Sequence, residues 1–122
     1  MRTVKQKDKN GCGVACVAML TNVSYEEARD VIYRAGRSRL TKTEDLYIAL
    51  KALGRNPLSK TRRGFYSTKL HELKTDALVF VELDDDGDNP KHWMVWDAAA
   101  KKLRDPDNRK LPYRLRGYLA VK

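Results

Sequence analysis

The order of hydrophobic and polar residues divides the chain into a helix-like first half and a strand-like second half. A nearly continuous apolar run extends from Val14 to Leu20, as expected of a central helix that is buried on most sides. Residues 24–36 and 41–54 instead show the periodic apolar pattern of helices with one exposed face. The first half is therefore predicted to contain three helices.

Both amphipathic segments carry start and stop signals. A polar side chain that can cap the first turn precedes each segment, and a glycine that favours a left-handed ending follows it. These residues are Ser24, Glu27 and Gly36 for the first segment, and Thr41 or Thr43 with Gly54 for the second.

After a loop that contains a short helix at 67–75, the pattern changes to that of β-strands. Branched and aromatic residues fill 77–83, residues 92–98 alternate, and shorter strand-like stretches follow at 101–106 and 113–122. Helices followed by hairpin-linked strands predict an α+β fold, with N-terminal helices packed on a C-terminal antiparallel sheet. The length of 122 residues suits one domain spanning residues 1–122.

Composition adds a strong positive charge to this picture. The 25 Lys and Arg exceed the 16 Asp and Glu by nine, and the excess gathers in residues 34–42 and 59–65, which read as loops. Such a balance suits nucleic acid, an anionic membrane surface or an acidic protein, although a solvated basic surface is the simpler explanation. Nucleic acid is not favoured, because the basic runs mostly lack stacking aromatics. No secretory or membrane-spanning segment is evident, so we expect a cytoplasmic protein, with delivery to another cell left open.

The chain has two cysteines, Cys12 and Cys16, four residues apart on the first predicted helix. That spacing is poor for a disulfide, so we expect reduced thiols. Together with His71 and His92 the cysteines do not form a zinc pattern, and we expect neither a metal nor a cofactor. Cys16 lies among apolar residues and is predicted to belong to the core.

Cys12 is the candidate nucleophile, because amides at the first turn of a helix stabilise a thiolate. The flanking Gly11 and Gly13 would allow a sharp turn and a close approach of substrate. A catalytic thiol needs a base, and His92 at the start of a predicted strand is a better candidate than an exposed helical histidine. Asp105, after the next predicted strand, would orient the imidazole. Taken singly, His92 also suits a structural hydrogen bond, and Asp105 an ordinary Asp-Pro turn.

Three motifs occur together in the order of a known family. "QKDKNGCGVACVAM" is followed by "HWMVWD" and then by "LRDPD". In these motifs the chain resembles the bacteriocin-processing cysteine peptidases, the papain-like domains of exporters that cleave double-glycine leader peptides. The resemblance covers most of the chain and implies a papain-like fold and a peptide or protein substrate.

The resemblance also implies individual roles. Cys12 would be the nucleophile, His92 its base and Asp105 the residue that orients His92, while Gln6 would donate a hydrogen bond in the oxyanion hole. The chain departs from the family in having Gly11 where an Asp often precedes the cysteine, and no exporter segment follows. A small-residue sequence such as Gly-Gly would suit a narrow cleft beside two tryptophans, although strand alternation directs Trp93 and Trp96 to opposite faces.

The leading hypothesis is therefore a cysteine peptidase, or a related thiol hydrolase, that cleaves a peptide or amide bond. The same residues could serve a glutamine deamidase or an acyl-transferring effector or toxin domain. A third alternative is a non-catalytic basic module that binds nucleic acid or an acidic protein. The acidic stretch 84–88 is predicted to be a hairpin turn that could adjust the electrostatics near His92, because its spacing does not suit a calcium loop.

Overall fold

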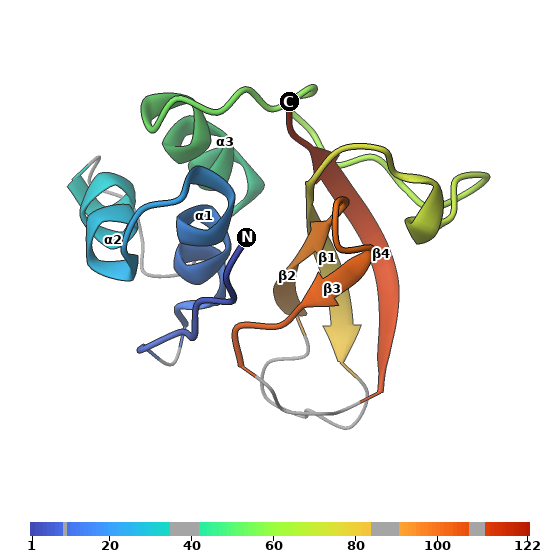
Figure 1. Ribbon diagram of the computed structural model, residues 1–122, viewed down its shortest axis with the longest axis horizontal. Helices are drawn as coiled ribbons and strands as arrows, with labels where there is room; N and C mark the ends of the chain where they lie inside the picture. The colour runs from blue at the N-terminus through green and yellow to red at the C-terminus, as the bar shows by residue number, and fades with distance from the viewer. Residues whose placement is uncertain (9, 35–41, 84–90, 108–111) are drawn as a thin grey trace.

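A computed structural model describes residues 1–8, 10–34, 42–83, 91–107 and 112–122. Three helices precede an antiparallel sheet of four strands, which confirms the predicted α+β arrangement (Figure 1). The elements are α1 (Cys12–Thr21), α2 (Tyr25–Arg34), α3 (Thr43–Ala52), the short 3₁₀ helix η1 (Leu70–Glu72), β1 (Ala77–Leu83), β2 (Lys91–Asp97), β3 (Lys102–Arg104) and β4 (Tyr113–Ala120). None of the helices in the described ranges is long and apolar enough to span a bilayer.

The observed helix ends agree only in part with the predicted caps. Ser24 Oγ accepts a hydrogen bond from the Glu27 amide at 3.1 Å, as predicted, whereas Gly36 and Thr41 lie outside the described residues. The prediction of Thr43 as a cap is wrong, because α3 begins at that residue.

The residue that caps α3 is Lys42, whose amide donates to the Asp45 carboxylate at 3.0 Å. The carboxylate of the third helical residue thus accepts from the amide of the cap residue, as it does in a capping box. Gly54 follows the helix with a φ of 89°, a conformation that favours glycine, as predicted.

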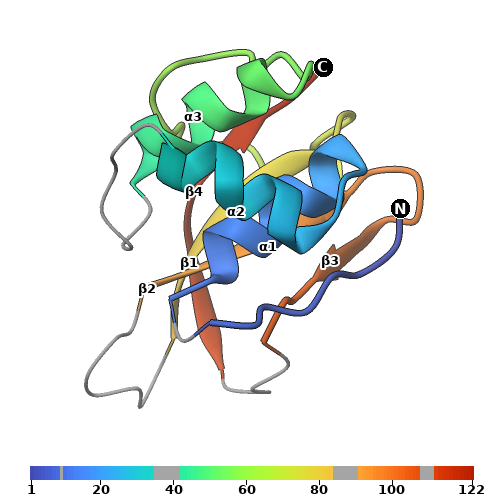
Figure 2. The same cartoon turned by 90° about the vertical axis from the view of Figure 1, so that its left-hand side faces the viewer.

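The four strands lie in the order β3-β2-β1-β4. β1 and β2 pair along their length, with Val81 opposite His92 and Phe80 opposite Trp93. The register of β1 with β4 shifts between Phe80 and Val81, as in a β-bulge. Figures 1 and 2 show the three α-helices on one side of the sheet, and α1 packs against β2 as well as against α2 and α3.

Both faces of the sheet are covered. Leu78, Trp93 and Val95 pack against the helices, whereas Val79, Met94 and Trp96 pack on the opposite face with side chains of the segment 65–73. The two tryptophans are therefore on opposite faces, as strand alternation predicted, and both are buried. They do not flank a shared open cleft, so that part of the sequence-based interpretation is wrong.

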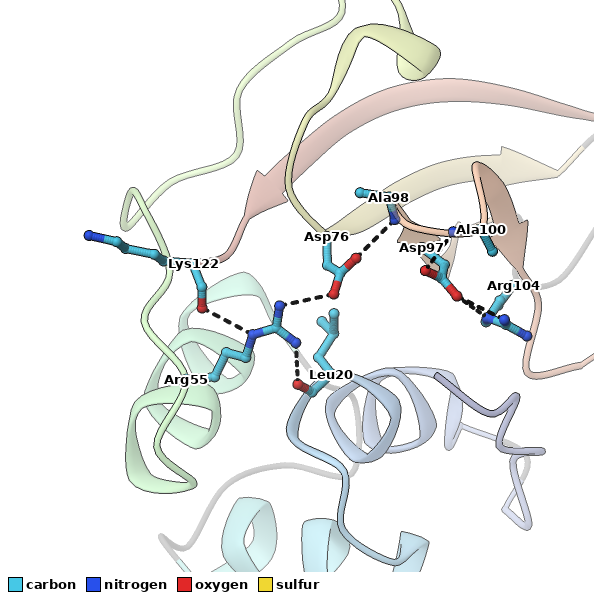
Figure 3. A network of polar contacts seen from close by, with 8 residues as sticks. All are labelled: Leu20, Arg55, Asp76, Asp97, Ala98, Ala100, Arg104 and Lys122. Carbon is cyan, nitrogen blue, oxygen red and sulfur yellow. Dashed lines mark hydrogen bonds and ion pairs between the residues drawn. The ribbon is translucent and has the colours of Figure 1, made fainter.

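Arg55, in the loop after α3, connects distant parts of the backbone (Figure 3). Its guanidinium donates to the carbonyls of Leu20 and Lys122 at 2.6 and 3.1 Å, and to the Asp76 carboxylate at 2.9 Å. The other oxygen of Asp76 accepts from the Ala98 amide at 2.9 Å. This half-buried network ties the end of α1 to the start of β1 and to the end of β2.

Candidate active site

The two cysteines differ in the way that the sequence predicted. Cys12 is the first residue of α1 and is partly exposed, whereas Cys16 is completely buried in the core. Burial raises the pKa of the Cys16 thiol well above its ordinary value, and the nearby charges of Cys12 and Asp105 raise it further. Cys16 is therefore held as a neutral thiol, and Cys12 is the one available for chemistry.

His92 and Asp105 form a close pair. His92 is the second residue of β2 and is only 1% exposed, and its Nε2 lies 2.8 Å from Asp105 Oδ1. Asp105 directly follows β3, which pairs with β2, so strand pairing brings the carboxylate beside the ring. The same oxygen accepts from the Asp107 amide at 2.9 Å. The Asp-Pro turn thus provides both a local turn hydrogen bond and the partner of the histidine.

Cys12 interacts with the same imidazole. Burial alone would lower the pKa of His92, but the hydrogen bond to Asp105 and the interaction with the Cys12 sulfur overcome this and raise that pKa to about 9. Nδ1 of the ring is buried and makes no hydrogen bond of regular geometry within the described part of the chain. Hydrogen bonds between catalytic groups often tighten only when substrate is bound. The fold thus brings together three of the four predicted site residues, namely Cys12, His92 and Asp105.

Gln6, the fourth predicted residue, lies in the segment that leads into α1. Its backbone amide donates to the Pro106 carbonyl at 3.0 Å, which joins this segment to the turn that carries Asp105. Its side-chain Nε2 donates to the Asp8 carbonyl at 3.2 Å, and the Gly11 amide donates to the same carbonyl at 3.0 Å. The amide group is therefore oriented by the loop just before Cys12, and its oxyanion role stays a prediction.

Tyr25 supports this loop, and sequence reasoning missed it. Its hydroxyl donates to the Asp8 carboxylate at 2.7 Å and accepts from the Asp8 amide at 3.3 Å. The hydroxyl also occupies the space beside Gly11, since a Cβ at that position would lie 2.1 Å from it. Gly11 is thus required for packing against Tyr25, a role that the sequence did not suggest. No local sequence signal distinguishes this tyrosine from an ordinary aromatic residue in the core.

A second structural support lies at the edge of the sheet. Arg104 of β3 contacts the buried Asp97 carboxylate through two nitrogens, at 2.8 and 2.9 Å, and donates to the Thr3 hydroxyl at 2.8 Å. These contacts hold the N-terminal segment against β3, immediately before Asp105. No sequence motif marked this cluster, because its members are far apart along the chain.

The remaining sequence-based predictions concern metals and the acidic turn. No group of three or more His, Cys, Asp or Glu side chains among the described residues is arranged to hold a metal ion. Residues 84–88, predicted to influence His92, lie outside the described residues. His71 is exposed in η1, as predicted for the histidine that was set aside.

Comparisons of this chain with protein-family models, with curated proteins and with solved structures find no significant match. The assignment of roles to Cys12, His92 and Asp105 therefore depends on the geometry described above.

Proposed function

We propose that this chain is a papain-like cysteine peptidase, or a closely related thiol hydrolase, that cleaves a peptide or amide bond. The observation that carries the proposal is the hydrogen bond between the buried His92 imidazole and the Asp105 carboxylate, together with the electrostatic interaction of the same ring with Cys12 at the start of α1. A thiol, an imidazole and an orienting carboxylate are the parts of a nucleophilic triad. Their order, with the thiol on the central helix and the other two on the sheet, agrees with a papain-like arrangement.

The protonation of the pair suits this chemistry. A His92 pKa of about 9 favours the imidazolium at neutral pH, and an imidazolium beside Cys12 stabilises the thiolate. The thiolate would attack the substrate carbonyl, and its electron pair would form the carbon–sulfur bond. The imidazolium would then give its proton to the leaving amine as the carbon–nitrogen bond breaks. Water, deprotonated by the neutral imidazole, would attack the thioester carbonyl, and cleavage of the carbon–sulfur bond would release the acid and restore the thiolate–imidazolium pair.

The oxyanion of the tetrahedral intermediate needs donors near the start of α1. The backbone amide of Cys12 is one candidate, and the Gln6 side chain is the other. Its Nε2 donates to the Asp8 carbonyl, within the loop that leads directly to Cys12. One such donor typically contributes about 3 kcal/mol to transition-state stabilisation. Replacement of Gln6 with alanine should therefore lower kcat by roughly a hundredfold without changing the reactivity of the thiol.

The test combines thiol labelling with peptide cleavage. Iodoacetamide at pH 6.5 should modify one cysteine per chain rapidly, and peptide mapping should identify it as Cys12. The same protein should cleave members of a peptide pool with a central Gly-Gly, as detected by mass spectrometry. Cys12→Ala and His92→Ala should abolish cleavage, whereas His71→Ala, a matched exposed histidine, should leave it unchanged.

Two outcomes would count against the proposal. Labelling of Cys12 at the slow rate of a free cysteine, unaffected by His92→Ala, would mean that the thiol is not activated. Rapid labelling without cleavage of any peptide would leave a reactive thiol but remove the peptidase. A mass increase of about one dalton at a glutamine, the mass of an amide converted to an acid, would assign the same residues to deamidation.

A further inference from the structure

We propose that a pocket between α3 and the loop 59–62 binds an acidic side chain of the peptide substrate, a subsite that rests on the proposed function. The pocket has a volume of about 600 Å³. One wall is formed by the first turns of α3, including Tyr47 and Ile48, and the other by Lys60, Thr61 and Arg62. In Figure 2 the beginning of α3 and the beginning of β2 lie toward the same edge of the molecule.

Arg62 links this pocket to the strand that carries His92. Its guanidinium carbon lies 4.0 Å from the centre of the Phe80 ring and 6.0 Å from that of the Trp93 ring. Trp93 directly follows His92 on β2, and Phe80 lies opposite Trp93 on β1. A guanidinium stacked on an aromatic ring keeps its N–H donors available at its edge for a carboxylate. Phe80 and Trp93 also belong to the same hydrophobic cluster as Cys12, on the helical side of the sheet. A peptide bound at Cys12 would therefore reach this cation on the same side of the sheet, within a few residues.

The charges of the pocket favour an anion. Lys60 and Arg62 are both exposed, and neither forms an ion pair with any residue in the described ranges. Among the described residues that line the pocket, Glu44 is the single carboxylate, so cations outnumber it there. The lining also contains Ile48, which is 38% exposed, and the ring of Tyr47. The best occupant is an acidic side chain next to an apolar one.

The loop that supplies the cations is held in place before any ligand binds. Arg63 exchanges two backbone hydrogen bonds with Tyr118 of β4, at 2.9 and 2.8 Å. Gly117 allows this close crossing, since a Cβ there would lie 3.1 Å from the Arg63 carbonyl and 3.4 Å from the Arg62 Cβ. The Arg62 guanidinium is already positioned by the backbone of its loop and by the Phe80 ring. Binding of an acidic side chain would therefore require little further ordering of this arginine.

Binding can be tested without turnover in the Cys12→Ala protein. The probes are two fluorescein-labelled pools of ten-residue peptides with a central Gly-Gly, one with Asp and Glu at the flanking positions and one with Asn and Gln in their place. Fluorescence anisotropy at low salt should show that the acidic pool binds about tenfold more tightly. Lys60→Gln with Arg62→Gln should remove this preference, and the corresponding charge reversal to Glu should invert it. Lys74→Gln with Lys102→Gln is the control, because it removes the same charge from exposed lysines outside the pocket.

Equal affinity for the two pools, including no detectable binding of either, would overturn the proposal. A preference that persists in the pocket variant but is lost in the control would also overturn it, because the cause would then be net charge elsewhere. Tighter binding of a labelled RNA 12-mer, lost in the pocket variant, would assign the pocket to nucleic acid instead. Binding of the acidic pool without any cleavage by the unmodified protein would leave the subsite in place and remove the peptidase.

Discussion

Replacement of Asp105 with asparagine tests the central pair most directly. Asparagine preserves the size of the side chain and one carbonyl acceptor, but it removes the negative charge that lies 2.8 Å from His92 Nε2. The imidazolium of His92 should therefore lose stability relative to the neutral ring. A shift of the His92 titration to lower pH, with slower alkylation of Cys12, is the expected result.

The size of the effect follows from the environment of the ring. The pKa of His92 rises from 6.5 to about 9, which corresponds to roughly 3 kcal/mol in favour of the charged form. Asp105 supplies the leading favourable contribution, against the cost of burying a ring that is 1% exposed. A hydrogen bond between charged groups contributes about 1.5–3 kcal/mol, of which a neutral acceptor retains part. The midpoint should therefore fall by about one pH unit.

Nuclear magnetic resonance can follow this titration, because the chain contains only two histidines. The ring signals of His71, which is exposed, provide an internal reference. The midpoint of His92 belongs to the coupled pair with Cys12, so the Cys12→Ala protein should be titrated as well. Asp30→Asn, on the surface of α2, is the matched control. A His92 midpoint that is the same in Asp105→Asn and in the unmodified protein would refute the orienting role of Asp105.

Three further predictions concern stability. Gly11→Ala should lower the free energy of unfolding, measured in urea, by about 1–3 kcal/mol, because the new Cβ would lie 2.1 Å from the Tyr25 hydroxyl. Adding Tyr25→Phe should recover part of this loss. Fully additive effects of the two substitutions would contradict the packing explanation. Arg55→Ala should lower the free energy of unfolding by about 2–4 kcal/mol. The double variant with Asp76→Ala should lose much less than the sum of the two single losses. Additive losses would disprove the coupling between Arg55 and Asp76. Because the folded-state pKa of His92 is raised, its contribution to the free energy of unfolding should be complete below pH 6.5 and lost as the pH rises through about 9. In His92→Gln the free energy of unfolding should fall less steeply over this pH range. An unchanged slope would assign the decline to other groups.

Most of the fold follows from local sequence patterns. The apolar run after Cys12, the branched residues of 77–83 and the glycine after α3 each act within a few neighbouring positions, and the structure has the predicted element at each of them. The α3 cap was mispredicted because the helix begins at Thr43 itself, so that the cap position falls on Lys42, a residue type that a search for capping side chains passes over.

The candidate site was predictable to the extent that its chemistry is concentrated in motifs. Cys12, His92 and Asp105 are recognisable because a thiol, an imidazole and a carboxylate occur in a familiar order. Tyr25 and Arg104 could not be found in this way, since their roles depend on contacts with segments far away in the chain. The subsite at Arg62 was seen in the sequence only as part of a basic loop. Its stacking on Phe80 depends on the path of that loop across the sheet.

Cys12 and His92 are far apart along the chain, and this determines when the two side chains can meet during biosynthesis. Cys12 is translated before His92 of β2 and before Asp105, which follows β3. β2 pairs with both β1 and β3. A growing polypeptide on the ribosome therefore carries the thiol without its base while residues 13–91 are made. In a cell, the hydrolase proposed here would stay inert toward neighbouring nascent chains until β2 and β3 had emerged and paired. The reactive pair would thus form only in chains whose sheet has begun to assemble.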